Sequence, residues 1–421
     1  MSFKRRDFIR ASAAGLAGVA VTGATAVSAK VADTDFDHVT PLAGDAVPIS
    51  VDERKARIAK AQRLMAENKI DAIFLDGGTA MNYFTGVQWG NSERMMAAII
   101  PAKGEVKYVG PHFEEARLRE LIKIGNDVRV WEEHESPYKV VAQIFSDFGI
   151  KTGRIGMEER VRFFLFDGIR KEASNLEYVS ADPVTVQCRI IKSPAELALM
   201  QKANDITLES YRIAVAELKE GMTQGDLADL ISKAHGKMGV RGGALVSFGE
   251  FTAFPHGSAA PQKLKKGDVV LIDGGCSVHG YASDITRTFV FGEPTKRQRE
   301  IWNLEKAAQA AGFAAAKLGA PCENVDIAAR KVITDAGFGP GYKVPGLPHR
   351  TGHGIGMDGH EWGNMVLGNK QPLQPGMCFS VEPTICIYGE FGIRIEDCAY
   401  MTEQGAKWFT TPSESIDKPF V

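Results

Sequence analysis

Two aspartates lie on segments that the sequence predicts to be the arms of one β-hairpin. The apolar run Val269-Val270-Leu271-Ile272 ends at Asp273 and two glycines, and a second run of strand-forming residues, 281–290, contains Asp284. We expect the hairpin to fold about the Val278–His279 bond, which places Asp273 opposite Asp284. Directly opposite residues in an antiparallel pair have Cβ atoms roughly 4.5–5.5 Å apart, so the two carboxylates would lie close together.

A pair of glutamates repeats this arrangement near the end of the chain. Glu382 lies in the predicted strand 377–387 and Glu396 in the predicted strand 393–401, and folding about Gly389 places them opposite each other. Carboxylates held this closely among apolar neighbours repel each other strongly. Two divalent cations, roughly 3.5–4 Å apart in such sites, remove that conflict. Two symmetric acidic pairs in apolar strands therefore predict a metal site.

Three of the nine histidines fall within twelve residues, in the run His349-Arg350-Thr351-Gly352-His353-Gly354-Ile355-Gly356 and at His360. Imidazole is a common metal ligand, and the glycines permit a close approach of the backbone. The Gly-x-Gly element is not followed by the Lys-Ser/Thr of a phosphate-binding loop. No Gly-x-Ser-x-Gly element is present, which disfavours a serine hydrolase. The cluster therefore adds imidazole groups to the predicted metal site.

The elements before residue 185 alternate between helices and short apolar strands. The spacing of Ile58, Ala61, Leu64 and Met65 predicts a helix over 51–68. The remaining predictions for this part are strands at 70–75, 96–101, 106–109 and 128–131 and a helix at 114–124, and the part is expected to close near residues 176–179. This alternation is typical of an α/β domain, which we place at residues 51–184.

A second domain, residues 185–421, is predicted to hold both hairpins. It begins with a helix that Ser193 caps, with Pro194 in the first helical position and Glu196 in the first turn. Thr223 and Asp226 begin another helix. Helices followed by the hairpin strands predict an α+β fold for this domain.

The composition is that of an ordinary globular protein, with 44% apolar and 24% charged residues in 421. The formal net charge of −2, with no strongly basic block beyond the N-terminus, argues against nucleic acid as a partner. Cysteines form no Cys-x-x-Cys pair, and most are expected to be small buried side chains whose spacing does not predict disulfides. They are Cys188, Cys276, Cys322, Cys378, Cys386 and Cys398.

The first 29 residues have the pattern of an export signal. The basic start contains Arg5-Arg6, an Ala/Gly-rich run covers 11–26, and Val27-Ser28-Ala29 matches a cleavage site. The run is short and poor in Leu and Ile for a membrane anchor, so no stable anchor is expected. We predict a twin-arginine signal, a periplasmic or secreted mature protein, and an extended arm at residues 30–50.

Taken together, these motifs resemble a family of metallopeptidases. The sequence is similar to the creatinase, prolidase, aminopeptidase P and methionine aminopeptidase group, the M24 family with the pita-bread fold. Its five metal ligands occur in the order Asp, Asp, His, Glu, Glu, and the matching motifs are Asp-Gly-Gly, Asp-Ile-Thr-Arg-Thr, Gly-His-Gly-Ile-Gly, Val-Glu-Pro and Arg-Ile-Glu-Asp. They give Asp273, Asp284, His353, Glu382 and Glu396. Residues 51–180, including Tyr83-Phe84-Thr85-Gly86, resemble the family's N-terminal domain.

The resemblance implies roles for the ligands. Asp284 and Glu396 would bridge two metal ions, Asp273 would complete one site, and His353 with Glu382 would complete the other. A hydroxide between the metals would be the nucleophile, and Glu382 would carry its proton. An oxygen-rich donor set favours manganese, with cobalt, iron or zinc as alternatives.

The resemblance also implies roles for residues beside the metals. His256, in Phe-Pro-His-Gly, and His360, in His-Glu, match histidines that lie on the substrate side of the site. They would stabilise the oxyanion and steer the leaving nitrogen. His349 and Arg394 would support the ligands. The implied activity is removal of an N-terminal residue, with proline favoured at the second position, by an enzyme that is usually a homodimer.

The sequence departs from the prolidase pattern after His360-Glu361, where Trp362-Gly363-Asn364 replaces a residue followed by proline, and Thr384 replaces the usual glycine after Glu-Pro. Dipeptidase and aminopeptidase action both remain open. The alternatives are a metal-dependent lyase or small-molecule amide hydrolase on the same fold, metal-free creatinase-like hydrolysis, and a binding module. Five intact ligands argue against the last two.

Overall fold

The computed structural model describes residues 36–420. The predicted export signal and the first residues of the predicted arm lie outside this range. The described part of the arm contains a short 3₁₀ helix, η1 (Ala43–Asp45). Its backbone is tied to a neighbouring loop, because the N–H groups of Leu42 and Ala43 both lie 3.2 Å from the carbonyl oxygen of Met238. Phe36 is buried.

None of the helices within residues 36–420 combines the length and the apolar character needed to cross a membrane.

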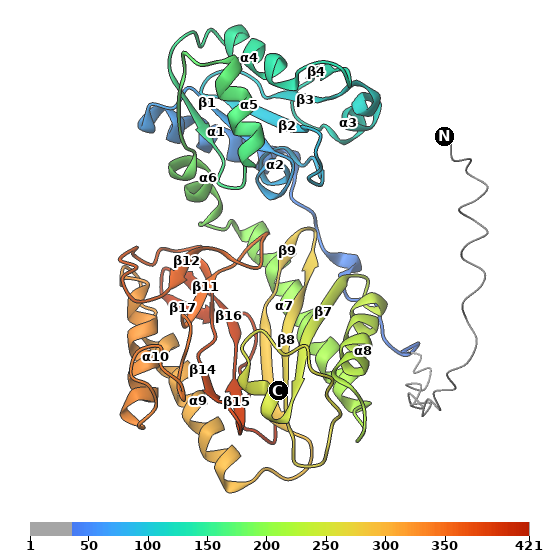
Figure 1. The fold of residues 1–421 in the computed structure, drawn as a ribbon, viewed down its shortest axis with the longest axis vertical. Helices are drawn as coiled ribbons and strands as arrows, with labels where there is room; N and C mark the ends of the chain where they lie inside the picture. Colours follow the sequence, from blue (N-terminus) through green and yellow to red (C-terminus); the bar gives the residue numbers. More distant parts are fainter. Residues whose placement is uncertain (1–35, 421) are drawn as a thin grey trace, which may run out of the picture. The chain divides into compact units, whose positions relative to one another are not determined.

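The N-terminal domain is built on a six-stranded mixed sheet in the order β4-β3-β2-β1-β5-β6 (Figure 1). Its strands are β1 (Ala72–Asp76), β2 (Ala97–Pro101), β3 (Lys107–Pro111), β4 (Asp127–Trp131), β5 (Arg154–Met157) and β6 (Glu177–Ser180). Its helices are α1 (Val51–Asn68), α2 (Thr79–Thr85), α3 (Glu115–Leu121), α4 (Pro137–Asp147), α5 (Phe163–Glu172) and α6 (Asp182–Arg189). The prediction of a helix at 51–68 is confirmed to the residue.

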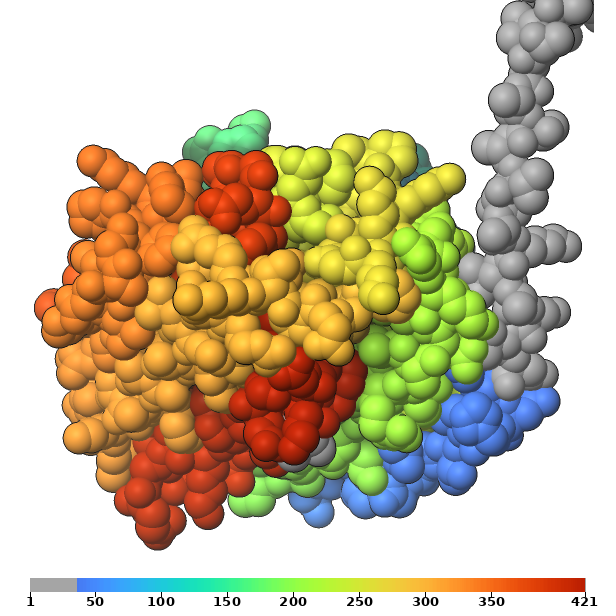
Figure 2. Space-filling model, turned by 90° about the horizontal axis from the view of Figure 1, so that it is seen from below, coloured from blue at the N-terminus to red at the C-terminus, as the bar shows by residue number. Residues whose placement is uncertain are grey.

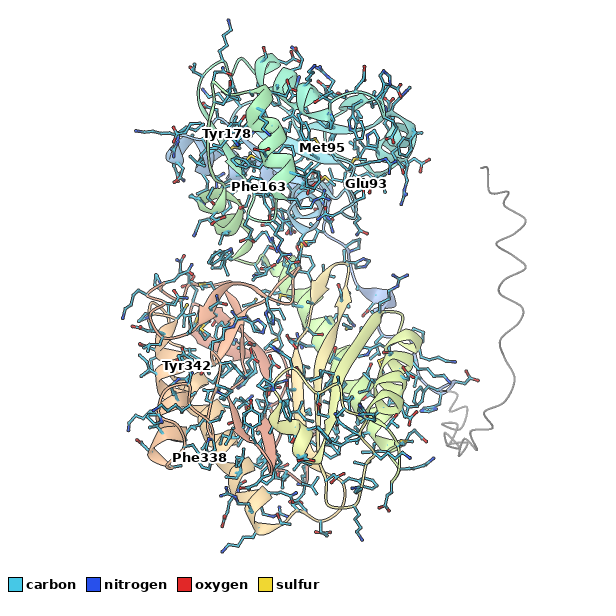
Figure 3. The ribbon with its side chains drawn as sticks, in the orientation of Figure 1. Glu93, Met95, Phe163, Tyr178, Phe338 and Tyr342 are labelled. Atoms are coloured by element: carbon cyan, nitrogen blue, oxygen red, sulfur yellow. The ribbon has the colours of Figure 1, made fainter. Side chains whose placement is uncertain are left out.

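Both faces of this sheet are covered, because successive side chains of a strand point to opposite faces. Ile73 and Leu75 of β1 pack with α1, α2, α3 and α6, whereas Ala72 and Phe74 pack with α4 and α5. Met95 and Tyr178, labelled in Figure 3, belong to the second of these cores. The buried strands therefore read as continuous apolar runs, as expected for an α/β layer.

The C-terminal domain begins with two capped helices, α7 (Pro194–Ala216) and α8 (Gln224–Lys237). Capping boxes at Ser193 and Glu196 and at Thr223 and Asp226 confirm the two predicted helix starts. Two further helices follow, α9 (Lys296–Ala315) and α10 (Glu323–Asp335). A short 3₁₀ helix, η3 (Gly249–Ala253), lies between the first two strands of the domain.

The strands of this domain form three sheets, in the orders β10-β8-β7, β12-β11-β13-β16-β17 and β14-β15. An isolated bridge between Thr286 and Glu396 joins the first sheet to the hairpins of the others. The strands are β7 (Arg241–Phe248), β8 (Val269–Val278), β9 (Tyr281–Ala282), β10 (Ile285–Val290), β11 (Gly352–Gly354), β12 (Glu361–Met365), β13 (Cys378–Val381), β14 (Thr384–Ile387), β15 (Phe391–Arg394), β16 (Asp397–Thr402) and β17 (Gly405–Trp408). The predicted α+β, pita-bread class is confirmed.

The predicted register of the first hairpin was wrong by two residues, because the turn is displaced by one position. Val278 pairs with Tyr281 and Asp273 pairs with Thr286, so the turn is centred on His279 and Gly280 instead of the Val278–His279 bond. His279 and Gly280 both have positive φ, 47° and 89°, the backbone that a two-residue hairpin turn requires. Asp284 is therefore a diagonal neighbour of Asp273, on the same face of the sheet.

The predicted register of the second hairpin is confirmed. Val381 pairs with Asp397 and Thr384 pairs with Arg394, which centres the hairpin on Gly389. Each predicted long strand is interrupted near its middle, between β13 and β14 and between β15 and β16. Glu382 and Glu396 occupy these interruptions, where the backbone leaves one sheet and enters another.

The end of the chain packs on the C-terminal domain. The dark red segment in Figure 2 lies beside the light-orange helix α9, and an ion pair between Arg299 and Asp417 joins the two. The rings of Phe289 and Phe420 lie 6.2 Å apart. All six cysteines are buried, and in residues 36–420 none forms a disulfide.

Candidate metal centre

The five predicted metal ligands line one cavity of about 800 Å³. Asp273 lies within β8, Asp284 between β9 and β10, His353 within β11, Glu382 directly after β13, and Glu396 directly before β16. These positions come from two sheets, so the fold brings together residues that are up to 123 positions apart in the sequence.

His353 lies at the centre of the carboxylates. Its Nε2 atom is 3.2 Å from Oε1 of Glu382, 3.7 Å from Oδ2 of Asp284 and 4.0 Å from Oε1 of Glu396. Its Nδ1 atom is 3.0 Å from the carbonyl oxygen of Gly354. Because a carbonyl only accepts, Nδ1 carries a proton, so in the neutral ring Nε2 is the atom that faces the carboxylates and can bind a metal.

The donor atoms form overlapping groups of three, each with all atoms within 4.8 Å of one another. One group is His353, Glu382 and Glu396, and another is Asp273, Asp284 and Glu396. Asp284 also belongs to a third group, with His353 and His360. Glu396 and Asp284 are thus the carboxylates that each belong to two of the three donor groups.

Thr286 is a residue that the sequence analysis missed. Its hydroxyl lies 2.8 Å from Oδ1 of Asp273 and 2.7 Å from Oε2 of Glu396. Nε of Arg394 donates to the hydroxyl oxygen of Thr286 at 3.2 Å. Arg394 also pairs with Asp273 and donates to the carbonyl oxygen of Pro255 at 3.0 Å. The sequence does contain a signal for this residue. Side chains two positions apart in a strand point to the same face of the sheet, and Thr286 is two positions after Asp284.

The carboxylates repel each other in the way that the sequence predicts. Burial, together with the charges of Asp273 and Glu382, raises the pKa of Asp284 to about 7. Burial and the charges of Asp284 and Glu382 raise the pKa of Glu396 well above its usual value. Oε1 of Glu396 is buried without a hydrogen-bond partner. The cluster therefore carries negative charge that its own side chains do not neutralise, and lone pairs that they do not hydrogen-bond.

This donor set fits divalent cations. Four carboxylates against the one guanidinium of Arg394 leave the contacting side chains with a net charge of −3 when His353 is neutral. The neutral imidazole and the carboxylate oxygens are ligands that manganese and its neighbours accept. A bound cation would offset the mutual repulsion of the ionised carboxylates.

The three other predicted histidines also line this cavity. His256 is exposed in the loop after η3, and His349 is half-buried in the loop before β11. The ring of His360 lies 3.9 Å from that of His353, centroid to centroid. Burial and the charges of His353 and Arg350 lower the pKa of His360 to about 4, so this side chain is neutral at pH 7.

A buried ion cluster holds the loop that carries His360. Glu361 accepts the backbone N–H groups of Met357 and Asp358 at 2.9 and 3.2 Å, and it pairs with Arg189 at 2.6 Å and Lys192 at 2.9 Å. Although burial opposes it, these two cations lower the pKa of Glu361 to about 2. The loop that carries His360 is thus held by buried ion pairs.

Family models match nearly the whole described chain. Residues 198–403 match the model for metallopeptidase family M24, and residues 57–191 match the creatinase/prolidase N-terminal domain. An Xaa-Pro dipeptidase of Pyrococcus furiosus is 30% identical over 365 residues, 86% of this chain and 99% of that protein. The chain belongs to the M24 family of metallopeptidases.

Other proteins are similar to this M24 peptidase in sequence or in structure. An uncharacterized peptidase of Schizosaccharomyces pombe is 35% identical over 387 residues, 87% of this chain and 83% of that protein. The crystal structure of dipeptidase PepE from Mycobacterium ulcerans superposes with a TM-score of 0.79 at 30% identity, covering 87% of this chain and 97% of that one. The similarity therefore extends over both domains of this hydrolase.

Proposed function

We propose that this M24 peptidase hydrolyses the bond after an N-terminal residue, with proline at the second position, by means of two divalent metal ions. The observation that carries the proposal is the pair of three-residue donor groups that share Glu396. The preference for proline rests on the similarity to the Xaa-Pro dipeptidase of Pyrococcus furiosus.

Five residues would hold the two ions. Asp273 and Asp284 would lie on one side, His353 and Glu382 on the other, and Glu396 reaches both groups. A net charge of −3 exceeds what one divalent cation neutralises, which favours two ions, and the excess of oxygen donors favours manganese. When bound, the ions would lower the pKa of a water molecule, so that hydroxide is available at neutral pH.

The side chains around the metal positions would orient the peptide and move the proton. Glu382 would accept the proton of the attacking water and deliver it to the leaving nitrogen. Its Oε1 is held by Ser380 Oγ at 3.2 Å and His353 at 3.2 Å, which fixes the carboxylate for this task. His256 and His360 line the same cavity and would donate hydrogen bonds to the developing oxyanion and the peptide.

The preference for proline is tested with two dipeptides that differ in the second residue. The chelator-treated chain is supplied with manganese, and release of alanine from Ala-Pro and from Ala-Ala is measured for wild type and Glu382→Ala. The proposal predicts a higher kcat/KM for Ala-Pro and no measurable release by the variant. If manganese binds and neither dipeptide is cut, the search moves to small non-peptide substrates, the alternative for this fold.

The export signal, the periplasmic or secreted location and the homodimer remain predictions from the sequence and the family. N-terminal sequencing of the protein recovered outside the cytoplasm tests cleavage after Ala29. Light scattering on the purified mature chain tests the dimer.

A further inference from the structure

Asp358 connects the loop that carries His360 to the N-terminal domain. It lies between β11 and β12, two positions before His360. Thr79 donates its hydroxyl to Oδ1 of Asp358 at 2.7 Å, and Arg160 pairs with the same oxygen at 3.0 Å. Arg189 pairs with Oδ2 at 2.6 Å. Both oxygens of this carboxylate therefore accept hydrogen bonds from the N-terminal domain.

The three partners of Asp358 come from separate elements. Thr79 is the first residue of α2, Arg160 lies between β5 and α5, and Arg189 is the last residue of α6. The side chains of Asp358 and Arg189 are only 16% and 8% exposed, so water competes little for their contact. Hydrogen bonds between ionised groups are roughly twice as strong as those between neutral groups. Three elements of the N-terminal domain thus bind one carboxylate of the loop.

The His360 side chain has few contacts of its own. It is exposed, its ring centroid lies 3.9 Å from that of His353, and its Nδ1 lies 3.0 Å from Nη2 of Arg350. Because a guanidinium only donates, Nδ1 accepts, and the proton of the neutral ring is on Nε2. This N–H is the group that would donate to the substrate in the proposed function. A donor of this kind acts only within roughly 2.7–3.1 Å of the developing charge.

The backbone on the two sides of His360 is fixed by two acidic residues. On the C-terminal side, Glu361 is held by buried ion pairs. On the N-terminal side, Gly359 is exposed and has no side chain, so Asp358 is the nearest residue whose side chain can hold the backbone. Without the contacts of Asp358, the loop would be held on one side only, and His360 would sample more orientations.

We propose that Asp358 is a positioning residue, through which the N-terminal domain holds His360 in the orientation that hydrolysis needs. The inference rests on the proposed function, in which His360 donates a hydrogen bond to the substrate. It gives the N-terminal domain a part in the reaction, although the three side chains that bind Asp358 do not line the metal cavity. A displacement of about 1 Å costs on the order of 10²-fold in rate, so a small movement of the imidazole is measurable.

Two positions on opposite sides of this contact can be changed. Asp358→Asn keeps the shape of the side chain but removes its negative charge. Thr79→Val removes a single hydrogen bond from the side of the N-terminal domain, and Thr79→Ser keeps the hydroxyl that makes it. Asp147→Asn is the matched control, because Asp147 also pairs with an arginine, Arg129 at 2.9 Å, but does so within the N-terminal domain.

A double-mutant cycle with His360→Ala separates positioning from general damage to the fold. On Ala-Pro with manganese-loaded enzyme, Asp358→Asn should lower kcat/KM about 10–100-fold, mainly through kcat, while His360 is present. The same substitution should cost less than about threefold in the His360→Ala background. Thr79→Val should lower kcat/KM about 3–10-fold, again only while His360 is present. Thr79→Ser and Asp147→Asn should match wild type.

The affinity for manganese should be the same in Asp358→Asn and in wild type, because the partners of Asp358 lie outside the five predicted ligands. Weaker manganese binding by Asp358→Asn would overturn the inference, since the substitution would then act on the metal site. Unchanged kcat/KM in Asp358→Asn, or an equal loss with and without His360, would also overturn it while leaving the proposed peptidase intact.

The inference can be measured even if no dipeptide is cut and the proposed function fails. Inorganic phosphate is a tetrahedral anion, as is the intermediate of amide hydrolysis, and its binding to the manganese-loaded enzyme is followed by calorimetry. Phosphate binding that Asp358→Asn weakens only while His360 is present supports the positioning role. Binding that Asp358→Asn leaves unchanged, or weakens equally in the His360→Ala background, overturns it.

Discussion

The guanidinium of Arg287 and the carboxylate of Asp397 form an ion pair from which water is excluded. Nη2 and Oδ1 are 2.7 Å apart, and both side chains are 0% exposed. Arg287 also donates to the carbonyl oxygen of Glu396 at 2.9 Å. The two residues directly follow Thr286 and Glu396, so this pair fixes β10 to β16 behind the carboxylates of the site.

Breaking this pair should destabilise the protein far more than breaking a surface pair. Asp397→Asn leaves Arg287 charged, buried and without its counterion, which costs roughly 3–5 kcal/mol. Urea unfolding measures the loss. Asp417→Asn, which breaks the exposed pair with Arg299, is the control and should cost far less. Equal effects of the two substitutions would show that the buried pair does not fix the hairpins.

Asp284→Asn should make the metal-free protein more stable than wild type, and the metal-loaded protein less stable than wild type. The folded pKa of Asp284 is raised from 3.8 to about 7, so its ionisation opposes folding increasingly as pH rises through that window. Removing the charge should add roughly 1–3 kcal/mol at pH 8 in chelator. Thermal unfolding with chelator and with manganese measures both states. A variant that is less stable than wild type in chelator would contradict the predicted repulsion between Asp284 and the neighbouring carboxylates.

Thr286→Val should weaken metal binding with little change in the fold. The substitution keeps the shape of the side chain but removes the hydroxyl that contacts Asp273 and Glu396. Loss of such a supporting contact typically lowers metal affinity 10–100-fold. Calorimetric titration with manganese measures it. Thr288→Val is the matched control, because the Thr288 hydroxyl donates to the backbone oxygen of Arg394 and contacts neither carboxylate.

His235 should make the fold sensitive to acid. This histidine of α8 is 0% exposed, and burial lowers its pKa from 6.5 to about 4. As pH falls from 6.5 to 4, the unfolded chain binds a proton that the folded chain excludes, so stability decreases by up to roughly 3 kcal/mol. His235→Gln should lose less stability than wild type between pH 7 and 4.5 in urea unfolding. The exposed His134→Gln should follow the wild-type curve, and an identical curve for His235→Gln would refute the prediction.

Helices that are determined by nearby residues were predictable from the spacing of apolar residues and from helix caps. The apolar spacing of 51–68 and the caps at Ser193 and Thr223 gave helices that the structure confirms. The first hairpin was displaced by one position, because its register depends on the backbone at His279, a non-glycine residue with positive φ. That conformation is uncommon for such a residue and has no strong sequence signal.

The residues of the candidate site that lie in sequence motifs were predictable. Contacts that form only when distant segments of the chain fold together were not. The structure brings together the five motif residues and three histidines named from the sequence. Thr286 was not recognised, because its two partners, Asp273 and Glu396, lie more than 100 residues apart in the sequence and are brought together only by the fold.

The most direct test of the two-metal peptidase is a titration of activity against metal content. Chelator-treated protein receives manganese in steps from zero to four equivalents, and cleavage of Ala-Pro is measured at each step. The account predicts that activity rises to a plateau at two equivalents and is absent from Glu382→Ala throughout. Full activity at zero equivalents, or no cleavage after two equivalents have bound, would contradict it.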